Sequence, residues 1–271
     1  MLTLPDILAA TRHKVEESIS KADLPQLEQQ AAAHKPRGFR KALETASKSG
    51  TAAVIAELKK ASPSRGLIRN DFDPARLARD LEQAGATALS ILTDEEFFQG
   101  SLENLRTASW ATQLPCLRKD FIVDEFQILE ARANSADAVL LIVGALSSQE
   151  LKSLAKRAAE FELDVLCEVH DEVELGSALE IEANLIGVNN RDLRTFKVDP
   201  DTAFRVAQML PPGTIAVAES GIECGADVGK LRAAGYDAFL IGESLMKAQS
   251  PGDALRKLLS EAASSGASAG S

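Results

Sequence analysis

The stretch Val54-Ile55-Ala56-Glu57-Leu58-Lys59 is a short apolar run that ends in ionisable residues. Seven further short runs rich in Val, Ile and Leu follow it along the chain. Runs of this kind are typical of strands that are buried on both faces of a sheet. We therefore predict eight strands, at residues 54–58, 88–92, 115–118, 138–143, 165–169, 185–188, 215–218 and 238–241.

Segments of helical period lie between these strands, among them residues 74–84, 125–133, 148–161, 173–179, 202–209 and 226–234. Regular alternation of strands and helices requires parallel strands joined by crossover helices. A count of eight strands favours closure into a barrel over an open doubly wound sheet. The predicted fold class is therefore α/β, a single (β/α)8 TIM barrel.

The two ends of the chain differ from this pattern. The first fifty residues read as helices, with Thr3 as a plausible N-cap and with Pro25 and Pro36 separating shorter segments. The tail SEAASSGASAGS contains no apolar residue larger than Ala, a composition that favours disorder. We expect an N-terminal helical extension at 1–50, a catalytic barrel at 51–258 and a disordered tail at 259–271.

Composition excludes several classes of protein. The 271 residues include 30 Lys and Arg against 40 Asp and Glu, a net charge of −10, so nucleic acid is a poor partner. No apolar run approaches the ~20 residues that span a bilayer, and the N-terminus lacks the pattern of a signal peptide. The three cysteines lie far apart, which suits free thiols in a reducing compartment. We expect a cytoplasmic protein with no membrane partner, and take a monomer as the working expectation.

Ionisable and polar residues follow several of the predicted strands. Glu57 and Lys59 end the first strand, and residues two apart in a strand share a face. In a closed barrel the carboxyl ends of all strands form one rim, where the active sites of this fold lie. A single charged residue at this rim is as often structural as functional. Five strands that end this way favour a site for an anionic substrate that gains and loses protons. The candidates are Glu57, Lys59, Lys119, Glu168, Asn189, Arg191 and Glu219.

Glycine turns follow the last two strands, as Ser220-Gly221 and Gly242-Glu243. Many barrels hold a phosphate at these positions, on backbone N–H groups and a short helix N-terminus. Turns after strands also need Gly for conformational reasons alone, so the two turns are weak evidence by themselves. A side chain of Glu243 facing inward would oppose an anion, and only its backbone N–H is assigned to the site.

Two loops after strands add further candidates. The polar loop at residues 60–66 contains Ser62 and basic residues, and it either closes over the rim or lies solvated on the surface. Phe98 and Phe121 follow strand ends in a chain poor in aromatic residues, where they wall a flat ring or simply pack under a loop. The three histidines form no catalytic set, and His170 is expected to point away from Glu168. We find no metal-ligand cluster, Walker loop, nucleophile elbow or dinucleotide fingerprint, so no cofactor or metal is predicted.

Taken together, these segments closely resemble the indole-3-glycerol-phosphate synthase family over about residues 1–258. The matching stretches are Val54 to Ser64, Leu89 to Asp94, Phe98 to Ser101, Leu117 to Phe121, Glu168 to His170, Gly187 to Leu193 and Ala218 to Ile222. The resemblance implies a cofactor-free ring closure in tryptophan biosynthesis. In that reaction 1-(2-carboxyphenylamino)-1-deoxyribulose 5-phosphate loses CO2 and water to give indole-3-glycerol phosphate.

The resemblance also implies roles for the rim residues. Lys119 is the acid that protonates the ketone oxygen, and we expect nearby cations such as Lys59 and Arg191 to lower its pKa. Glu168 acts in dehydration, with Glu57 as the partner base and Lys59 as a second acid or a carboxylate ligand. Arg191, held by Asn189, pairs with the carboxylate of the anthranilate ring.

Further residues are assigned to substrate binding by the same resemblance. Phe98, Phe121, Leu140 and Leu193 wall the aromatic ring. Ser62, Ser220, Gly221, Gly242 and the N–H of Glu243 bind sugar and phosphate, and Glu219 orients Lys or Asn groups. The expected partner is therefore a small-molecule anionic substrate that carries a phosphate and an anthranilate carboxylate. Cys116 in the third strand departs from the family pattern and should affect packing alone.

Three other functions stay open on the sequence. A phosphoribosylanthranilate isomerase would need an acid–base pair, commonly Cys with Asp, at the mouth, whereas Cys116 lies inside a strand. A Schiff-base aldolase using Lys119 is disfavoured by the charged groups around that lysine. A noncatalytic sugar-phosphate binding barrel would need no acid–base pair, and two lysines and two glutamates argue against it.

Overall fold

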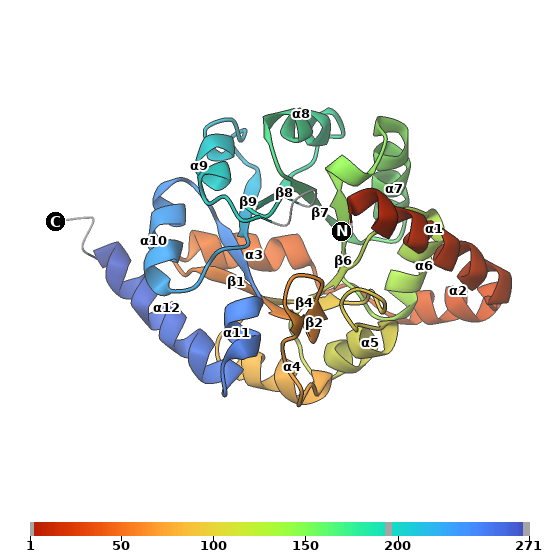
Figure 1. The fold of residues 1–271 in the computed structure, drawn as a ribbon, viewed down its shortest axis with the longest axis horizontal. Helices are drawn as coiled ribbons and strands as arrows, with labels where there is room; N and C mark the ends of the chain where they lie inside the picture. The colour runs from red at the N-terminus through yellow and green to blue at the C-terminus, as the bar shows by residue number, and fades with distance from the viewer. Residues whose placement is uncertain (1–2, 193–196, 268–271) are drawn as a thin grey trace.

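The computed structural model describes residues 3–192 and 197–267. Eight parallel strands close into a barrel in the order β1-β10-β9-β8-β7-β6-β5-β4, with helices around it (Figure 1). The predicted (β/α)8 barrel is confirmed, and every predicted strand lies within one residue of an observed one. The barrel strands are β1 (Ala53–Leu58), β4 (Ala88–Leu92), β5 (Cys116–Lys119), β6 (Ala138–Ile142), β7 (Asp164–Val169), β8 (Leu185–Asn189), β9 (Ile215–Glu219) and β10 (Ala238–Ile241).

A ring of helices covers the outside of the strands, with α8 and α9 above and α4 and α5 below in Figure 1. Several of these helices begin at a side-chain cap; Ser147 and Glu150, for example, form a capping box on α7. A two-stranded hairpin, β2 (Ala61–Ser62) with β3 (Gly66–Leu67), stands in the loop after β1. The ring helices are α4 (Pro74–Gln83), α5 (Leu102–Trp110), α6 (Glu125–Ala133), α7 (Ser148–Glu160), α8 (Glu172–Glu180), α9 (Asp201–Ala207), α10 (Gly225–Ala233), α11 (Glu243–Lys247) and α12 (Pro251–Ala267), with a short 3-10 helix at Val143–Ala145.

The N-terminal extension covers both ends of the barrel. It consists of α1 (Leu4–Lys21), α2 (Leu24–Ala33) and α3 (Phe39–Lys48). On α3, Phe39 and Leu43 are fully buried and join the apolar cluster inside the barrel, so this helix closes the end at which the strands begin. On α1, Leu4 and Ile7 reach the opposite end, where they line a small cavity beside the mouth.

A buried ion pair fastens the extension to the barrel. Asp137, immediately before β6, accepts hydrogen bonds from the backbone N–H of Arg37 (2.7 Å) and from its guanidinium (2.5 Å to Nη2). His34 lies 3.2 Å from the same carboxylate, and Cys116 donates its backbone N–H to it at 2.6 Å. Burial alone would raise the pKa of Asp137, but His34 and Arg37 outweigh it and lower that pKa. The carboxylate is therefore held ionised in the floor of the barrel.

Helix α12 continues to Ala267, so the prediction of disorder from residue 259 onward is wrong up to that position. Leu258 and Ala262 lie one turn apart and are both buried, which extends the apolar face of the helix into the tail. The backbone at Ala262 approaches Gly225 of α10 so closely that a Cβ on that glycine would collide with it. Packing of small residues, which composition alone does not reveal, orders this segment.

Candidate active site

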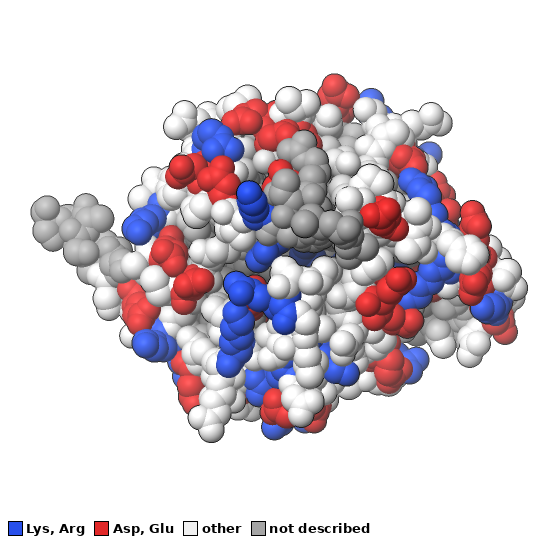
Figure 2. Space-filling model, viewed as in Figure 1, with Lys and Arg blue, Asp and Glu red and all other residues white. Residues whose placement is uncertain are grey.

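A cavity of ≈ 690 Å³ opens at the carboxyl ends of the strands. Lys and Arg side chains gather near the middle of this face of the molecule in Figure 2. Most of the residues that the sequence singles out line the cavity, so the predicted rim is one site. Those lining it are Glu57, Lys59, Phe98, Lys119, Phe121, Leu140, Glu168, Asn189, Arg191, Glu219, Ser220, Gly221, Gly242 and Glu243.

Two predicted residues lie elsewhere. Ser62 lines a smaller cavity of ≈ 60 Å³ that shares Lys59, Phe98 and Arg191 with the main one. It therefore stands beside the mouth, close to the side chains of α1. Leu193 lies outside the described residues, and its predicted place in the aromatic wall has no structural counterpart here.

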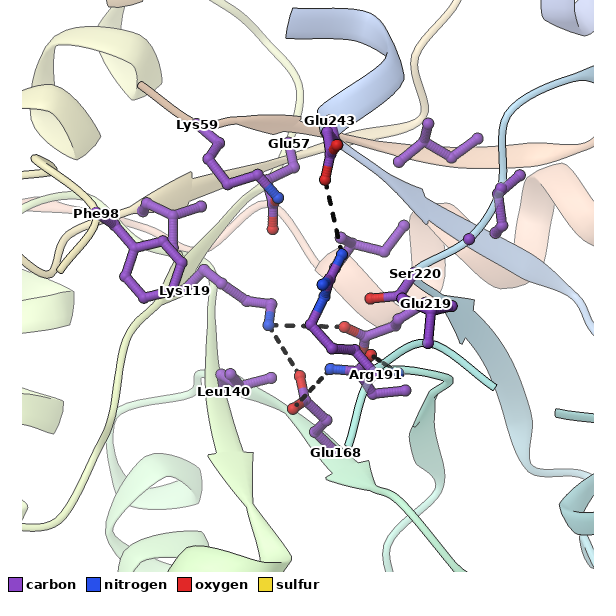
Figure 3. A pocket seen from close by; sticks show the side chains of 18 of the residues that line it. Glu57, Lys59, Phe98, Lys119, Leu140, Glu168, Arg191, Glu219, Ser220 and Glu243 are labelled. Carbon is purple, nitrogen blue, oxygen red and sulfur yellow. Dashed lines mark hydrogen bonds and ion pairs between the residues drawn. The ribbon is translucent and has the colours of Figure 1, made fainter. Parts of the chain in front are cut away.

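The centre of the cavity is an ammonium group among carboxylates (Figure 3). Nζ of Lys119 donates a hydrogen bond to Oε2 of Glu168 at 2.8 Å and lies 3.6 Å from Oε2 of Glu219. The other oxygen of Glu168 accepts a hydrogen bond from the amide of Asn189 at 3.1 Å. These four side chains come from β5, β7, β8 and β9, so closure of the barrel brings together residues far apart in sequence.

The surroundings of Lys119 contradict the expected pKa. Burial alone would lower the pKa of this lysine, but the charges of Glu168, Glu219 and Glu57 outweigh burial and raise it. The prediction of a lowered pKa is therefore wrong, because it considered the neighbouring cations and not the carboxylates that face the ammonium more closely. Lys119 is a stable cation in the free protein.

The pKa values of the two buried carboxylates, Glu168 and Glu219, shift in opposite directions. Burial would raise the pKa of Glu168, but Lys119 and His170 together outweigh it and lower that pKa. Burial and the neighbouring charge of Glu168 raise the pKa of Glu219 to about 8. A carboxyl group with that pKa carries a proton over much of the neutral range. The pocket thus holds one firmly ionised carboxylate and one that gains and loses a proton near neutral pH.

Gly187 makes room for Glu219. A Cβ built on Gly187 of β8 would collide with Oε1 of Glu219. That oxygen is buried and has no hydrogen-bond partner among the described residues. An unpartnered buried oxygen is costly, which is consistent with a carboxyl group that is protonated or that awaits a ligand.

A second ion pair lies on β1, where Nζ of Lys59 donates to Oε1 of Glu57 at 2.5 Å. The predicted orientation of these two side chains to the same face is confirmed by this contact. Gly242 of the last strand's turn packs directly on the Glu57 carboxylate, and a Cβ there would collide with it. This close approach leaves Glu57 buried in the wall of the cavity.

The side chain of Glu243 turns inward, although only its backbone was assigned to the site. Its carboxylate lies 3.0 Å from Nε of Arg65, 2.5 Å from Nζ of Lys247 and 3.6 Å from Nη2 of Arg191. These cations neutralise the carboxylate, which removes the repulsion that argued against an inward orientation. Figure 3 shows the contact between Arg191 and Glu243 above the central lysine.

The aromatic side chains form one wall. The rings of Phe98 and Phe121 have centroids 6.4 Å apart and are tilted by 42°. Asp94 fixes the turn that carries Phe98, since its Oδ1 accepts the backbone N–H groups of Phe97 (2.6 Å) and Phe98 (3.2 Å). Burial raises the pKa of Asp94 to about 6. Leu140 completes an apolar surface of suitable size for a flat ring.

Sequence reasoning missed several residues of the cavity. Arg65 lies in the basic loop that was noted, but no signal singled it out, and Lys247 and Asp94 carry no motif of their own. His170 was expected to point away from Glu168, yet its Nε2 lies 3.3 Å from Oε1 of that residue. That expectation was wrong because residues two apart share a face of a strand.

Two further features of the described residues bear on ligands and location. No group of three or more His, Cys, Asp or Glu side chains among them is arranged to hold a metal ion. Each helix in the described part of the chain is too short or too polar to cross a membrane.

Comparisons with known proteins point to one family. A sequence model described as "Indole-3-glycerol phosphate synthase" matches residues 4–258. A protein of that name from Koribacter versatilis is 55% identical over 257 residues, 95% of this chain and 98% of the relative. One from Burkholderia ambifaria is 47% identical over 255 residues, 94% of this chain and 98% of the relative.

Solved structures share the fold at low sequence identity. The tryptophan synthase alpha chain from Legionella pneumophila has a TM-score of 0.60 at 15% identity, covering 88% of this chain and 99% of that one. Thiamine phosphate pyrophosphorylase from Pyrococcus furiosus has a TM-score of 0.59 at 15% identity, covering 79% and 96%.

Proposed function

The chain belongs to the indole-3-glycerol phosphate synthase family, and on that premise we propose which side chains of the cavity perform the reaction. The enzyme is a carboxy-lyase of tryptophan biosynthesis. It closes the indole ring of 1-(2-carboxyphenylamino)-1-deoxyribulose 5-phosphate with loss of CO2 and water. One observation carries our assignment: Lys119 and Glu168, 49 residues apart in sequence, meet at 2.8 Å in the cavity that also holds Lys59 and Glu57.

Lys119 is the acid of the ring closure. The carbon of the aromatic ring that bears the carboxylate attacks the ketone, and the ketone oxygen becomes an alkoxide. An alkoxide is a strong base, so an ammonium group with a raised pKa still transfers a proton to it. The ammonium also stabilises the developing negative charge, because it is already positioned and largely shielded from water.

Loss of CO2 restores the aromatic ring. The hydroxyl group then sits on the former ketone carbon, which is separated from the ring nitrogen by one CH2 carbon. Elimination of water then requires a proton at the hydroxyl and a base at the adjacent C–H. Glu168 serves as that base, since its carboxylate is ionised and held by Lys119 and Asn189. Lys59 and Glu57 on the opposite wall supply the second acid–base pair.

The substrate's two anionic ends bind at different places. Arg191 pairs with the anthranilate carboxylate through its planar guanidinium, and Asn189 fixes the arginine backbone by accepting its N–H at 3.0 Å. The phosphate binds at the turns of Ser220-Gly221 and Gly242-Glu243, where α11 begins. Both Ser220 and Gly221 adopt positive φ angles, 64° and 77°, which bends the chain sharply at that turn.

Glu243→Gln tests whether the carboxylate at this turn competes with the substrate. The change keeps the backbone N–H but removes the negative charge next to Arg65, Lys247 and Arg191. We expect KM to fall about threefold, which corresponds to the free energy of one partly exposed ion pair. Inorganic phosphate should also inhibit more strongly. Steady-state kinetics with phosphate as inhibitor measure both. Glu223→Gln, on the same rim, is the matched control, and equal effects of the two changes would contradict a specific role for Glu243.

The synthase reaction is distinguished from its rivals by the product. With the carboxyphenylamino ketose phosphate as substrate, indole fluorescence should rise while one CO2 is released per product molecule. A product that retains its carboxylate would point to the isomerase, and binding without turnover to the noncatalytic barrel. Borohydride trapping of substrate on Lys119 would indicate the aldolase.

We also propose a cytoplasmic location, a monomeric state and the division of the chain at about residue 50, between the helical extension and the catalytic barrel. Two of the three cysteines, Cys116 and Cys167, are buried, and all three are free, as suits a reducing compartment. Light scattering tests the oligomeric state, and a mass twice that of the chain would contradict a monomer.

A further inference from the structure

His170 lies directly behind one of the catalytic carboxylates, outside the residues that line the cavity. It follows β7 and is largely buried, with 11% of its side chain exposed. Glu174, on the first turn of α8, accepts its backbone N–H at 2.8 Å and contacts Nδ1 at 2.9 Å. These two contacts fix the ring so that Nε2 faces Oε1 of Glu168 at 3.3 Å.

We propose that His170 and Glu174 form a charged positioning pair that keeps Glu168 ionised and directed at the substrate. The imidazolium stands between two carboxylates, one structural and one catalytic. Glu168 thereby faces a cation on two sides: the ammonium of Lys119, which is hydrogen-bonded to it, and the imidazolium behind it, whose Nε2 lies at ion-pair distance without a hydrogen bond among the described residues. This inference rests on the proposed role of Glu168 as the base of the dehydration.

The fold makes a dedicated place for Glu174. The 3-10 helix at Val143–Ala145 packs against its carboxylate, and a Cβ on Gly144 would collide with Oε1. Glu174 is also the third residue of its helix, where the N-terminal dipole favours a negative charge. The carboxylate therefore stays under the imidazole instead of turning to solvent.

The charges around His170 agree with a persistent cation. Its facing groups are Glu168 on β7 and Glu174 on α8, and beyond Glu168 lie Lys119 on β5 and Glu219 on β9. Burial alone would lower the pKa of His170, but the two carboxylates outweigh it and raise the pKa to about 10. The imidazolium is thus retained across the neutral range, and it opposes protonation of Glu168.

The sign of the pH effect follows from this arrangement. Removing the imidazolium raises the pKa of Glu168, so the active, ionised form disappears at a higher pH. In His170→Asn we expect the acid limb of the kcat–pH profile to move up by about one unit, the usual effect of a close opposite charge. At the optimum, kcat should fall about tenfold with little change in KM, by analogy with the scale seen for residues that orient metal ligands from behind.

The charge of His170 should also contribute to the stability of the fold. The pKa of His170 is about 10 in the folded protein and near 6.5 in an unfolded chain. Its charge therefore stabilises the fold fully below pH 6.5, and this contribution is lost as the pH rises through about 10. The difference in Tm between the wild type and His170→Asn should be largest at pH 6 and should shrink toward pH 10.

Two control histidines separate positioning from packing. His34→Asn removes a histidine beside the buried Asp137 in the barrel floor, and His13→Asn removes one from an exposed pair with Glu17. His34→Asn should lower Tm but leave the acid limb in place, and His13→Asn should change neither. Glu174→Gln should move the limb in the same direction as His170→Asn, by a smaller amount.

The closing experiment combines the pH profiles of these variants with NMR titration of the histidine side chains in the wild type. We expect His170 to remain an imidazolium at pH 8 and the acid limb to shift in both His170→Asn and Glu174→Gln. A neutral His170 at pH 7, or a lower kcat with an unmoved limb, would overturn the inference even if His170→Asn folds poorly. Glu168→Gln tests the proposed function independently of His170. Near-normal turnover in that variant would show that Glu168 is not the base, whatever the histidine variants do.

Discussion

Replacing Lys119 with alanine is expected to lower kcat by at least about 100-fold, the scale of general-acid catalysis. The change removes the proton donor for the ketone oxygen and the positive charge that stabilises the alkoxide. It also leaves Glu168 and Glu219 facing each other without the ammonium that lies 2.8 Å and 3.6 Å from them. Arg191, the aromatic wall and the phosphate turns remain, so KM should change far less than kcat.

Stopped-flow and steady-state indole fluorescence measure this effect, and Lys152→Ala provides the control. Lys152 is an exposed lysine on α7, and its removal should leave kcat and KM at wild-type values. A Lys119→Ala enzyme with kcat within a few-fold of the wild type would remove Lys119 from the mechanism. Equal losses in kcat and substrate affinity would instead assign it to binding.

The largest expected effect on stability comes from the floor of the barrel. Asp137→Ala should lower the free energy of unfolding by about 3–5 kcal/mol, because it leaves the guanidinium of Arg37 partly buried without its partner. The carboxylate is fully buried and serves Arg37, His34 and the N–H of Cys116 at once. The N-terminal extension should loosen first, since this contact ties it to β6.

Urea unfolding at two pH values checks both the size and the sign of that effect. The folded-state pKa of Asp137 is lowered, so its contribution is present above the normal aspartate pKa and is lost as the pH falls through the folded value. The loss in Asp137→Ala should therefore be large at pH 7 and smaller near pH 3. Asp253→Ala, which breaks an exposed pair with Arg256, should have no measurable effect. An equally small effect at Asp137 would contradict its role as the anchor.

The elements of this fold were predictable because they depend on local patterns. Apolar runs of four to six residues, such as those of β4 and β6, mark strands buried on both faces. The grouping of Glu57, Lys119 and Glu168 followed from topology, since the barrel places the carboxyl ends of all strands on one rim. The positions of catalytic candidates were thus available before any coordinates.

Properties that depend on which groups face each other were not predictable. The pKa of Lys119 was expected to fall, and it rises because three carboxylates from other strands surround it. The inward orientation of Glu243 depends on Arg65, from the distant hairpin loop after β1, and on Lys247, four residues further along α11. Neither residue carries a motif. The order of α12 depends on the burial of Ala262, a small residue that composition assigns to a disordered tail.

A crystal structure with indole-3-glycerol phosphate bound tests the central claim most directly. We predict the indole against Phe98 and Leu140, the phosphate at the N–H groups of Gly221 and Glu243, and Nζ of Lys119 and a carboxylate oxygen of Glu168 turned toward the ring that has closed. Both groups should reach the ligand at hydrogen-bond distance, directly or through one water molecule. A ligand bound with its phosphate elsewhere, and with Lys119 and Glu168 both out of contact with it, would contradict the assignment.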